Sequence, residues 1–265
     1  MQAISIVGCI KRKDSLCIII YCMYDIHCHL MPGVDDGADN MEETIQMAQL
    51  AASGGTKGIA VTPHCRIPGS YQNLWSQRLE DTLSRMRSEL DRRGIPIILF
   101  QGQEVFLAAG FLELLKEQKL ITINHSRYLL VEFDFYESGA SACQKLRQIA
   151  AEGYVPIVAH PERYAFFAAH SDAEVHIKAA GALLQVNKGS LKGSFGRTAF
   201  HTAHRLLDKR MADFVASDGH SPYVRTPFLR DVHEIINERY SADYADYLLK
   251  SNPSKVIEND RIYQY

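Results

Sequence analysis

The chain has 265 residues, a formal net charge of −2 and 46% hydrophobic residues. This nearly neutral balance lacks the basic footprint of a nucleic-acid-binding protein, so we expect no nucleic-acid partner. The six cysteines show neither disulfide-framework spacing nor a C-x-x-C pair. In a chain of this length, that pattern indicates reduced thiols and a cytoplasmic location.

Residues 1–22 resemble a signal peptide only superficially. Lys11–Lys13 is followed by the apolar run Leu16–Ile20, but that run is short and no small-residue cleavage site follows it. It is also far below the roughly 20 residues that a helix needs to cross a bilayer. Met23 stands directly before the first predicted strand. We therefore predict an N-terminal extension over residues 1–22, one domain over residues 23–265, and no membrane insertion.

A histidine pair marks the first predicted strand, which includes Tyr24–His29. Alternate side chains of a strand point to the same side, so His27 and His29 would present two imidazoles to one point. A metal ion can use such a pair, although two ordinary histidines would show the same spacing. The metal interpretation gains weight because similar side chains recur downstream.

Further short apolar runs end in side chains of the metal-binding types. Continuous apolar runs rich in β-branched residues are typical of buried parallel strands. Barrel enzymes carry their chemistry at the C-terminal ends of such strands. With the first strand and Leu183–Val186, seven strands are predicted. The other runs and the residues that end them are Gly58–Pro63 with His64, Ile97–Gln103 with Glu104, Tyr128–Val131 with Glu132, Val155–Ala159 with His160, and Phe214–Ser217 with Asp218 and His220.

Helical patterns lie between these strands. Asn40 and Glu43 resemble a capping box that opens a helix through Ala52, which Gly54 and Gly55 would end. Alternating strands and helices predict parallel βαβ units, and the length suits a single barrel of about 250 residues. The other helical patterns are Leu74–Arg93, Phe111–Gln118, Ala140–Glu152, Asp172–Ala180 and Thr198–Arg210.

Several ordered motifs allow a comparison with known families. They are YDIHCHLMPGVDDGA at Tyr24–Ala38, TPH ending at His64, GQE ending at Glu104, VEF around Glu132, AHPERY at Ala159–Tyr164 and SDGH at Ser217–His220. Together they resemble the polymerase-and-histidinol-phosphatase (PHP) superfamily, and within it the bacterial PHP-type tyrosine-protein phosphatases of capsule and exopolysaccharide loci. The resemblance implies the α/β class, a distorted (β/α)7 barrel (the PHP fold), and a trinuclear centre that is usually manganese-loaded. Members usually begin at the equivalent of Met23, so residues 1–22 are a departure from the family.

The resemblance also implies the ligands of that centre. By motif, the first ion would bind His27, His29, Glu104 and Asp218, the second would share Glu104 and bind Glu132 and His160, and the third would bind Asp36, His64 and His220. Imidazole and carboxylate donors without thiolate suit manganese, iron or zinc. We therefore expect two to three divalent ions, Mn²⁺ first, with iron or zinc as alternatives. Cys28 and Cys65 adjoin ligands but would face away on a strand, so we assign both to packing.

Two arginines follow predicted ligands in the sequence. Arg163 lies in the PERY segment, and Arg225 follows the SDGH motif. A guanidinium matches phosphate oxygens with paired donors, and the resemblance favours a role for both arginines in holding a substrate phosphate. A structural ion pair, for example between Arg163 and Glu162, is the alternative. No cysteine has an arginine at C-x5-R spacing, so the expected nucleophile is a metal-activated water.

The remaining histidines and several aromatic residues have simpler interpretations. Histidines outside the predicted strand ends need no functional role, and we expect ordinary surface placement for the pair His201 and His204. These histidines are His125, His170, His176, His201, His204 and His233. Aromatic residues near the motifs could gate the site or pack in the fold, and both interpretations stay open. These residues are Tyr71, Trp75, Tyr164 and Tyr223.

Three functions remain open at this point. The first is a metal-dependent protein-tyrosine phosphatase that acts on a bacterial tyrosine kinase of polysaccharide export. The second is a PHP phosphoesterase for a small molecule such as histidinol phosphate. The third is a non-catalytic, metal-stabilised PHP module, which the full ligand set disfavours. The DDGA motif and the paired arginines favour the phosphotyrosine protein as substrate.

Overall fold

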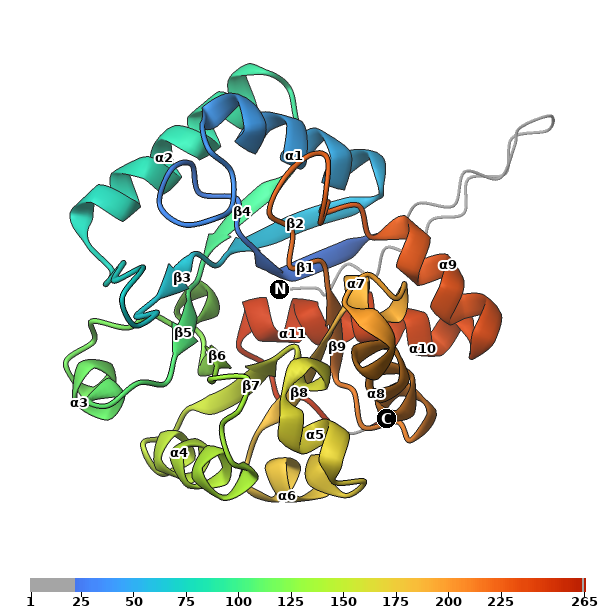
Figure 1. Ribbon diagram of the computed structural model, residues 1–265. Coiled ribbons are helices and arrows are strands. Elements are labelled where there is room, and N and C mark those ends of the chain that lie inside the picture. Colours follow the sequence, from blue (N-terminus) through green and yellow to red (C-terminus); the bar gives the residue numbers. More distant parts are fainter. Residues whose placement is uncertain (1–21, 264) are drawn as a thin grey trace, which may run out of the picture.

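All the described strands run parallel to their neighbours, in two sheets with helices outside them. The computed structural model describes residues 22–263 and 265 (Figure 1), so the predicted extension lies outside the described residues except for Cys22. One sheet has the order β1-β2-β4 and the other has the order β3-β5-β6-β7-β8-β9. The strands are β1 (Met23–Cys28), β2 (Thr56–Val61), β3 (His64–Cys65), β4 (Ile98–Gln101), β5 (Glu104–Phe106), β6 (Tyr128–Glu132), β7 (Val155–Ala159), β8 (Leu183–Asn187) and β9 (Phe214–Ala216).

The α/β class with parallel strands is confirmed, but two of the seven predicted strands are broken in two. The predicted strand that ends at His64 forms β2 and, after a short gap, β3. The predicted strand that ends at Glu104 likewise forms β4 and then β5. At the first break Pro63 has no N–H to donate to a strand ladder, while Thr62 still donates its N–H to Cys28 O of β1 at 3.0 Å. After the breaks, His64 pairs in register with Glu104 in the second sheet. The breaks therefore carry two predicted site residues from one sheet to the other.

The helices cover the outer faces of both sheets. In Figure 1, α1 and α2 flank the three-stranded sheet, while α4 and α6 lie outside the six-stranded sheet. The helices are α1 (Met41–Ser53), α2 (Gln77–Arg92), α3 (Phe111–Lys116), α4 (Gly139–Ala151), α5 (Ala165–Ala169), α6 (Ala173–Ala179), α7 (Lys188–Leu191), α8 (Gly196–Asp208), α9 (Arg230–Arg239), α10 (Ala242–Asp246) and α11 (Asn252–Glu258). Two 3-10 helices are η1 (Ile123–His125) and η2 (Pro161–Arg163), and η3 (Tyr247–Ser251) is a π-helix. No helix among the described residues is both long and apolar enough to cross a membrane.

The six predicted helices are confirmed, with ends that differ by a few residues. Asn40 caps α1, because its side chain accepts from the backbone N–H of Glu42 at 3.0 Å and of Glu43 at 3.1 Å. The Glu43 carboxylate accepts from the N–H of Asp39 at 3.1 Å, one residue earlier than a capping box requires. The largest difference is in α2, which begins after Ser76 because the Trp75 N–H is bonded to Lys119 O at 3.3 Å in a preceding loop.

A central apolar cluster connects the two sheets below their C-terminal edges. Ile26 of β1 and Ala60 of β2 belong to the same buried cluster as Leu130 of β6, Ile157 of β7 and Phe214 of β9. A separate cluster joins the six-stranded sheet to its outer helices. Because both faces of most strands are buried, their sequences read as continuous apolar runs rather than as alternating ones.

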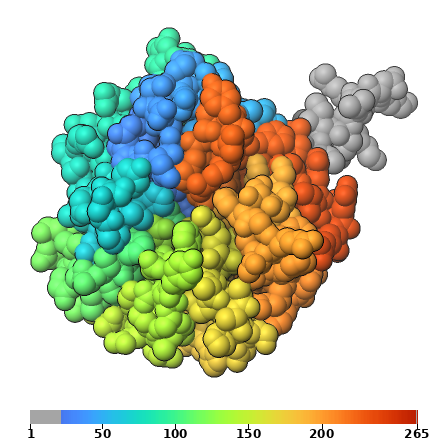
Figure 2. Space-filling view, viewed as in Figure 1, coloured from blue at the N-terminus to red at the C-terminus, as the bar shows by residue number. Residues whose placement is uncertain are grey.

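The first strand meets the segment after the last strand. An isolated parallel bridge joins Cys28 to Gly219, the His29 N–H donates to Gly219 O at 2.8 Å, and the Asp218 N–H donates to His27 O at 2.9 Å. In Figure 2, the segment after β1 (blue) lies directly against the segment after β9 (orange) on the face toward the viewer. Two motifs at opposite ends of the chain are thus placed side by side.

Candidate metal centre

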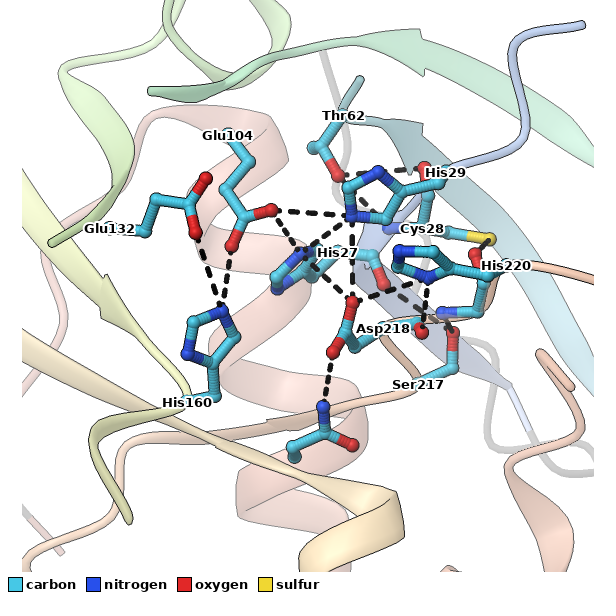
Figure 3. Close-up of polar contacts among 12 residues, drawn as sticks. His27, Cys28, His29, Thr62, Glu104, Glu132, His160, Ser217, Asp218 and His220 are labelled. Carbon is cyan, nitrogen blue, oxygen red and sulfur yellow. Dashed lines mark hydrogen bonds and ion pairs between the residues drawn. The ribbon is translucent and has the colours of Figure 1, made fainter. Parts of the chain in front are cut away.

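His27 and His29 point at each other and at two carboxylates. Their Nε2 atoms lie 3.2 Å apart. Glu104 Oε2 is 3.2 Å from the His27 nitrogen and 3.3 Å from the His29 nitrogen. Asp218 Oδ1 is 3.5 Å from each of them, and Figure 3 shows both carboxylates directed to this point. The spacing of the histidine pair therefore converges as the strand alternation predicts.

A second group of donors lies on the other side of Glu104. His160 Nε2 is 2.9 Å from Glu104 Oε1 and 4.0 Å from Glu132 Oε2. His64 Nδ1 is 2.8 Å from Glu132 Oε1 and 3.0 Å from Glu104 Oε2. Because Glu104 contacts both groups of donors, it occupies the position that a bridging ligand requires.

The third group lies nearer the surface. Asp36 Oδ1 is 3.5 Å from His64 Nε2 and 3.5 Å from His220 Nε2. His29, Asp36, His64 and His220 each offer a donor atom within 4.8 Å of the others. The turn that presents Asp36 lies on His29 so closely that a Cβ on Gly37 would be 2.1 Å from His29 O. A glycine is therefore required at this position of the DDGA motif.

All nine predicted ligands join in one continuous network of contacts. The network differs from the simple partition in two respects. His64 faces both the second and the third group, and His29 of the first group also offers a nitrogen to the third group. Within the described part of the chain, the buried polar atoms that have no hydrogen-bond partner include Glu104 Oε2 and His220 Nε2. Two imidazole nitrogens 3.2 Å apart and a cluster of buried carboxylates would be costly without a cation between them. The oxygen and nitrogen donors therefore fit a group of divalent ions.

Burial and mutual charge separate the pKa values of this cluster. Burial, reinforced by the charge of Glu104, raises the pKa of Glu132 to about 7. Burial would also raise the pKa of Glu104, but the nearby His27 and His64 outweigh it and hold that pKa well below its usual range. Burial lowers the pKa of His160 to about 4. At neutral pH these values give an ionised Glu104 and a neutral His160, the forms in which both groups bind metal.

Three polar residues that the sequence analysis missed hold the cluster in place. Gln185 Oε1 lies 2.8 Å from His27 Nδ1, and Asp35 Oδ2 lies 2.8 Å from His29 Nδ1. Asn187 Nδ2 donates to Asp218 Oδ2. Partners of this kind fix the tautomer and orientation of metal-binding groups. The alternation of Gln185 and Asn187 at the end of a predicted strand was the sequence signal that could have identified them.

Both predicted arginines lie at the edge of the same cavity, close to Asp218. Arg225 Nη2 is 2.5 Å and Arg163 Nη1 is 3.8 Å from Asp218 Oδ2. Glu162 does not form the suggested pair with Arg163, because its Oε1 accepts from the backbone N–H of Asn187 at 2.9 Å. The cavity has a volume of about 420 Å³ and is lined by both arginines, by Asp36, His64, Glu132, His160 and Asp218, and by a wall that includes Ile67, Pro68, Phe106, Phe133 and Phe135.

The four candidate gate residues have different positions. Tyr71 stacks on His64 with an interplanar angle of 3°, and Tyr223 is 74% exposed. Tyr164 is fully buried, and its hydroxyl accepts from the Phe133 N–H at 3.2 Å, so it packs in the core. Trp75 also packs against a core cluster. The packing interpretation holds for Tyr164 and Trp75.

Two structural predictions away from the ligands can also be compared with the fold. Surface placement was wrong for His204, which is 7% exposed because it lies on the inner face of α8, with Nε2 3.3 Å from Leu191 O. His201 on the same helix is exposed, as predicted. Cys28 and Cys65 are fully buried, and burial raises the pKa of the Cys65 thiol to about 12. Both cysteines are packing residues.

Comparisons with known proteins identify the family of this chain. The family model for capsular polysaccharide synthesis proteins CpsB/CapC matches residues 23–258. The chain belongs to the CpsB/CapC family. Among CpsB/CapC relatives, the tyrosine-protein phosphatase YwqE of Bacillus subtilis is 29% identical over 242 residues, which cover 91% of this chain and 94% of YwqE. The tyrosine-protein phosphatase CpsB of Streptococcus pneumoniae is 27% identical over 245 residues, which cover 91% of this chain and all of CpsB.

Solved structures place the CpsB/CapC fold in a wider group. A chain from the crystal structures of YwqE and CpsB, described as metal-dependent tyrosine phosphatases, superposes with a TM-score of 0.84 at 29% identity. That match covers 92% of this chain and 97% of the other. A histidinol phosphate phosphatase from Lactococcus lactis superposes with a TM-score of 0.54 at 16% identity, covering 87% of this chain and 97% of the other. The second likeness shows a shared PHP-like fold.

Proposed function

We propose that the protein is a metal-dependent protein-tyrosine phosphatase. The observation that carries the proposal is one cavity of about 420 Å³ that brings together five of the nine predicted ligands and both arginines. Relatives aligned over most of their length are named tyrosine-protein phosphatases. The physiological substrate we propose is a phosphotyrosine protein, a bacterial tyrosine kinase of capsule or exopolysaccharide synthesis, encountered in the cytoplasm.

The proposed ligands are the nine residues of the network, and the proposed cofactor is Mn²⁺, two to three ions per chain. Bound divalent ions would supply an activated water and neutralise charge on the phosphoryl oxygens. Glu104 and Asp218, both ionised, and the histidines hold those ions at the strand ends. Gln185 and Asp35 keep the Nε2 atoms of His27 and His29 directed into the centre.

The arginines and the apolar wall determine which phosphate ester can enter. Arg163 and Arg225 both line the cavity and can hold phosphoryl oxygens with paired donors. The apolar part of the cavity wall contains Phe106, Phe133 and Phe135, which suits an aromatic ring. A tyrosine side chain spans this wall and reaches the centre from outside, whereas the short side chain of serine would have to bring its backbone into the cavity. We therefore propose a preference for phosphotyrosine over phosphoserine.

The two sheets also support the barrel that the resemblance implies. We propose that they are arcs of one distorted (β/α)7 barrel, with β2–β3 and β4–β5 each counted as one strand. The bridge between Cys28 and Gly219 and the shared central cluster support this view. Residues 23–265 would be the barrel domain, with residues 1–22 as an extension.

The test is a comparison of phosphate release from three substrates. The substrates are a phosphotyrosine peptide, the matching phosphoserine peptide and histidinol phosphate, each with manganese and with chelator. We expect manganese-dependent release, fastest from the phosphotyrosine peptide. A kcat/KM for histidinol phosphate that is tenfold higher, about 1.4 kcal/mol in transition-state binding, would establish the small-molecule phosphatase instead. An absence of hydrolysis in the metal-loaded protein would support the non-catalytic module.

A further inference from the structure

A second cavity adjoins the proposed substrate cavity. It has a volume of about 320 Å³ and lies between α5 and the start of α8. Its lining includes Phe135, Arg163, Tyr164, Ala168, Phe195 and Thr198. Phe135 and Arg163 also line the cavity that contains the candidate metal centre. The two cavities are therefore neighbours that share a wall.

The shared wall is a stack of two rings with a guanidinium between them. The Arg163 Cζ atom is 4.7 Å from the ring centroid of Phe135 and 4.7 Å from that of Phe195. Phe195 is held by close packing, because a Cβ on Gly189 would lie 2.5 Å from its ring. Cation–π contacts with both rings and this packing restrict the movement of Arg163. The same stack thus positions a proposed phosphate-binding group and borders the second cavity.

The chemistry of the second cavity favours an apolar occupant. The only carboxylate among the described lining residues belongs to Glu162, which is 1% exposed and accepts a hydrogen bond from the backbone N–H of Asn187. The cation of this cavity, Arg163, already lies between two rings and close to Asp218. The rest of the described lining is aromatic or small, and at its edge Phe135 is 42% and Tyr136 is 88% exposed. Contiguous apolar surface that is exposed beside a cavity commonly marks a ligand-binding groove or an interaction site.

We propose that this cavity is a specificity subsite for an apolar side chain next to the phosphotyrosine of the substrate protein. The proposal rests on the proposed phosphatase function. Consecutive Cα atoms are about 3.8 Å apart, so a residue one or two positions from the phosphotyrosine can cross the Phe135–Arg163–Phe195 wall. The phosphotyrosine would then occupy the metal cavity while its neighbour fills the second one. The protein would select phosphotyrosines by their sequence context.

The first test compares peptides that differ only beside the phosphotyrosine. Three peptides carry leucine, glycine or aspartate at the flanking positions, and phenyl phosphate serves as a substrate without flanks. We expect kcat/KM for the leucine peptide to exceed that for the glycine peptide at least tenfold, because a hydrophobic pocket typically distinguishes substrates that differ in apolar size by about tenfold or more. Equal rates would overturn the subsite, and a preference for aspartate would assign the cavity to acidic partners through Arg163.

The second test fills the cavity without altering the metal centre. Ala168→Phe places a ring into the cavity from α5, and Ala169→Phe is the matched control, since Ala169 is also exposed on α5 but does not line the cavity. Ala168→Phe should remove the leucine preference and leave phenyl phosphate turnover unchanged, whereas Ala169→Phe should change neither. Thr198→Phe, which fills the cavity from α8, should repeat the effect.

The outcomes separate the subsite from the function on which it rests. The subsite alone would be refuted if the protein turned over phenyl phosphate but showed no preference among the peptides. It would also be refuted if Ala168→Phe and Ala169→Phe lost the leucine preference equally. Failure of the wild-type, metal-loaded protein to hydrolyse phenyl phosphate and all the peptides would refute the phosphatase proposal, and the subsite with it. If one filled variant does not fold, the other gives the same comparison.

Discussion

Replacing Gln185 by leucine should weaken metal binding without unfolding the protein. The Gln185 Nε2 atom donates to Val186 O at 3.0 Å, so its Oε1 must be the atom that accepts from His27 Nδ1 at 2.8 Å. This hydrogen bond places the proton on Nδ1 and leaves the Nε2 lone pair free for a metal. Leucine has a similar size but no acceptor, and both partners are fully buried. His27 would lose its fixed tautomer and keep a buried, unsatisfied N–H.

The expected magnitude follows from the same contact. Loss of a partner that orients a metal-binding histidine typically lowers metal affinity 10–100-fold, about 1.4–2.7 kcal/mol. That range agrees with the cost of about 1–3 kcal/mol for a buried unsatisfied donor. Gln185→Glu keeps an acceptor at the same place and should recover most of the affinity.

The assay is a chelator competition in which bound metal and the thermal midpoint are followed together. The control is Gln101→Leu, because Gln101 is 5% exposed and contacts His125, a histidine outside the predicted ligand set, at 3.0 Å. Wild-type metal affinity in Gln185→Leu would refute the orienting role. An equal loss in Gln101→Leu would show that any buried glutamine at a strand end has this effect.

Other predictions follow from the same geometry. Chelation should abolish activity and lower the thermal midpoint, because ions that bind only the folded state stabilise it; full activity in metal-free protein would contradict the mechanism. Glu104→Ala should disturb two metal sites in a titration. His64→Ala should leave metal bound at Glu104 and its other partners. Arg163→Ala or Arg225→Ala should keep metal content and reduce turnover by about 2.7–4 kcal/mol in transition-state stabilisation, with partial rescue by lysine; unchanged kinetics would make both arginines structural. Deletion of residues 1–22 should preserve solubility, metal content and turnover, and an insoluble product would show that the segment packs into the domain.

The local elements of the fold could be predicted because their signals are local. Asn40 caps α1 and Gly54 ends it, as the sequence indicates. Strand breaks could not be predicted in the same way, because they depend on which partner each residue pairs with. Thr62 bonds to β1 while His64 pairs with Glu104, and this division is decided by the packing of two sheets.

The candidate site was predictable in its members but not in its connections. Metal-type side chains at strand ends identified most of the cluster, since parallel strands bring their C-terminal ends to one face. The double contact of His64 depends on a ring orientation that sequence does not give. The burial of His204 was also missed, because it depends on which face of α8 meets the core. Gln185 and Asn187 show that the period of two is informative beyond the usual metal ligands.

The contact between the first strand and the segment after the last one has a consequence for folding. His27 and Asp218 are separated by 191 positions, and the Asp218 N–H donates to His27 O. Ions held between these residues would act as a cross-link that closes a very long loop, and the chain-entropy estimate for such a link is about 5 kcal/mol. Contacts of long sequence separation also form slowly. The centre should therefore assemble late, only after both sheets have formed, so that a chain that ends before Asp218, or one that is incompletely folded, has neither bound metal nor activity.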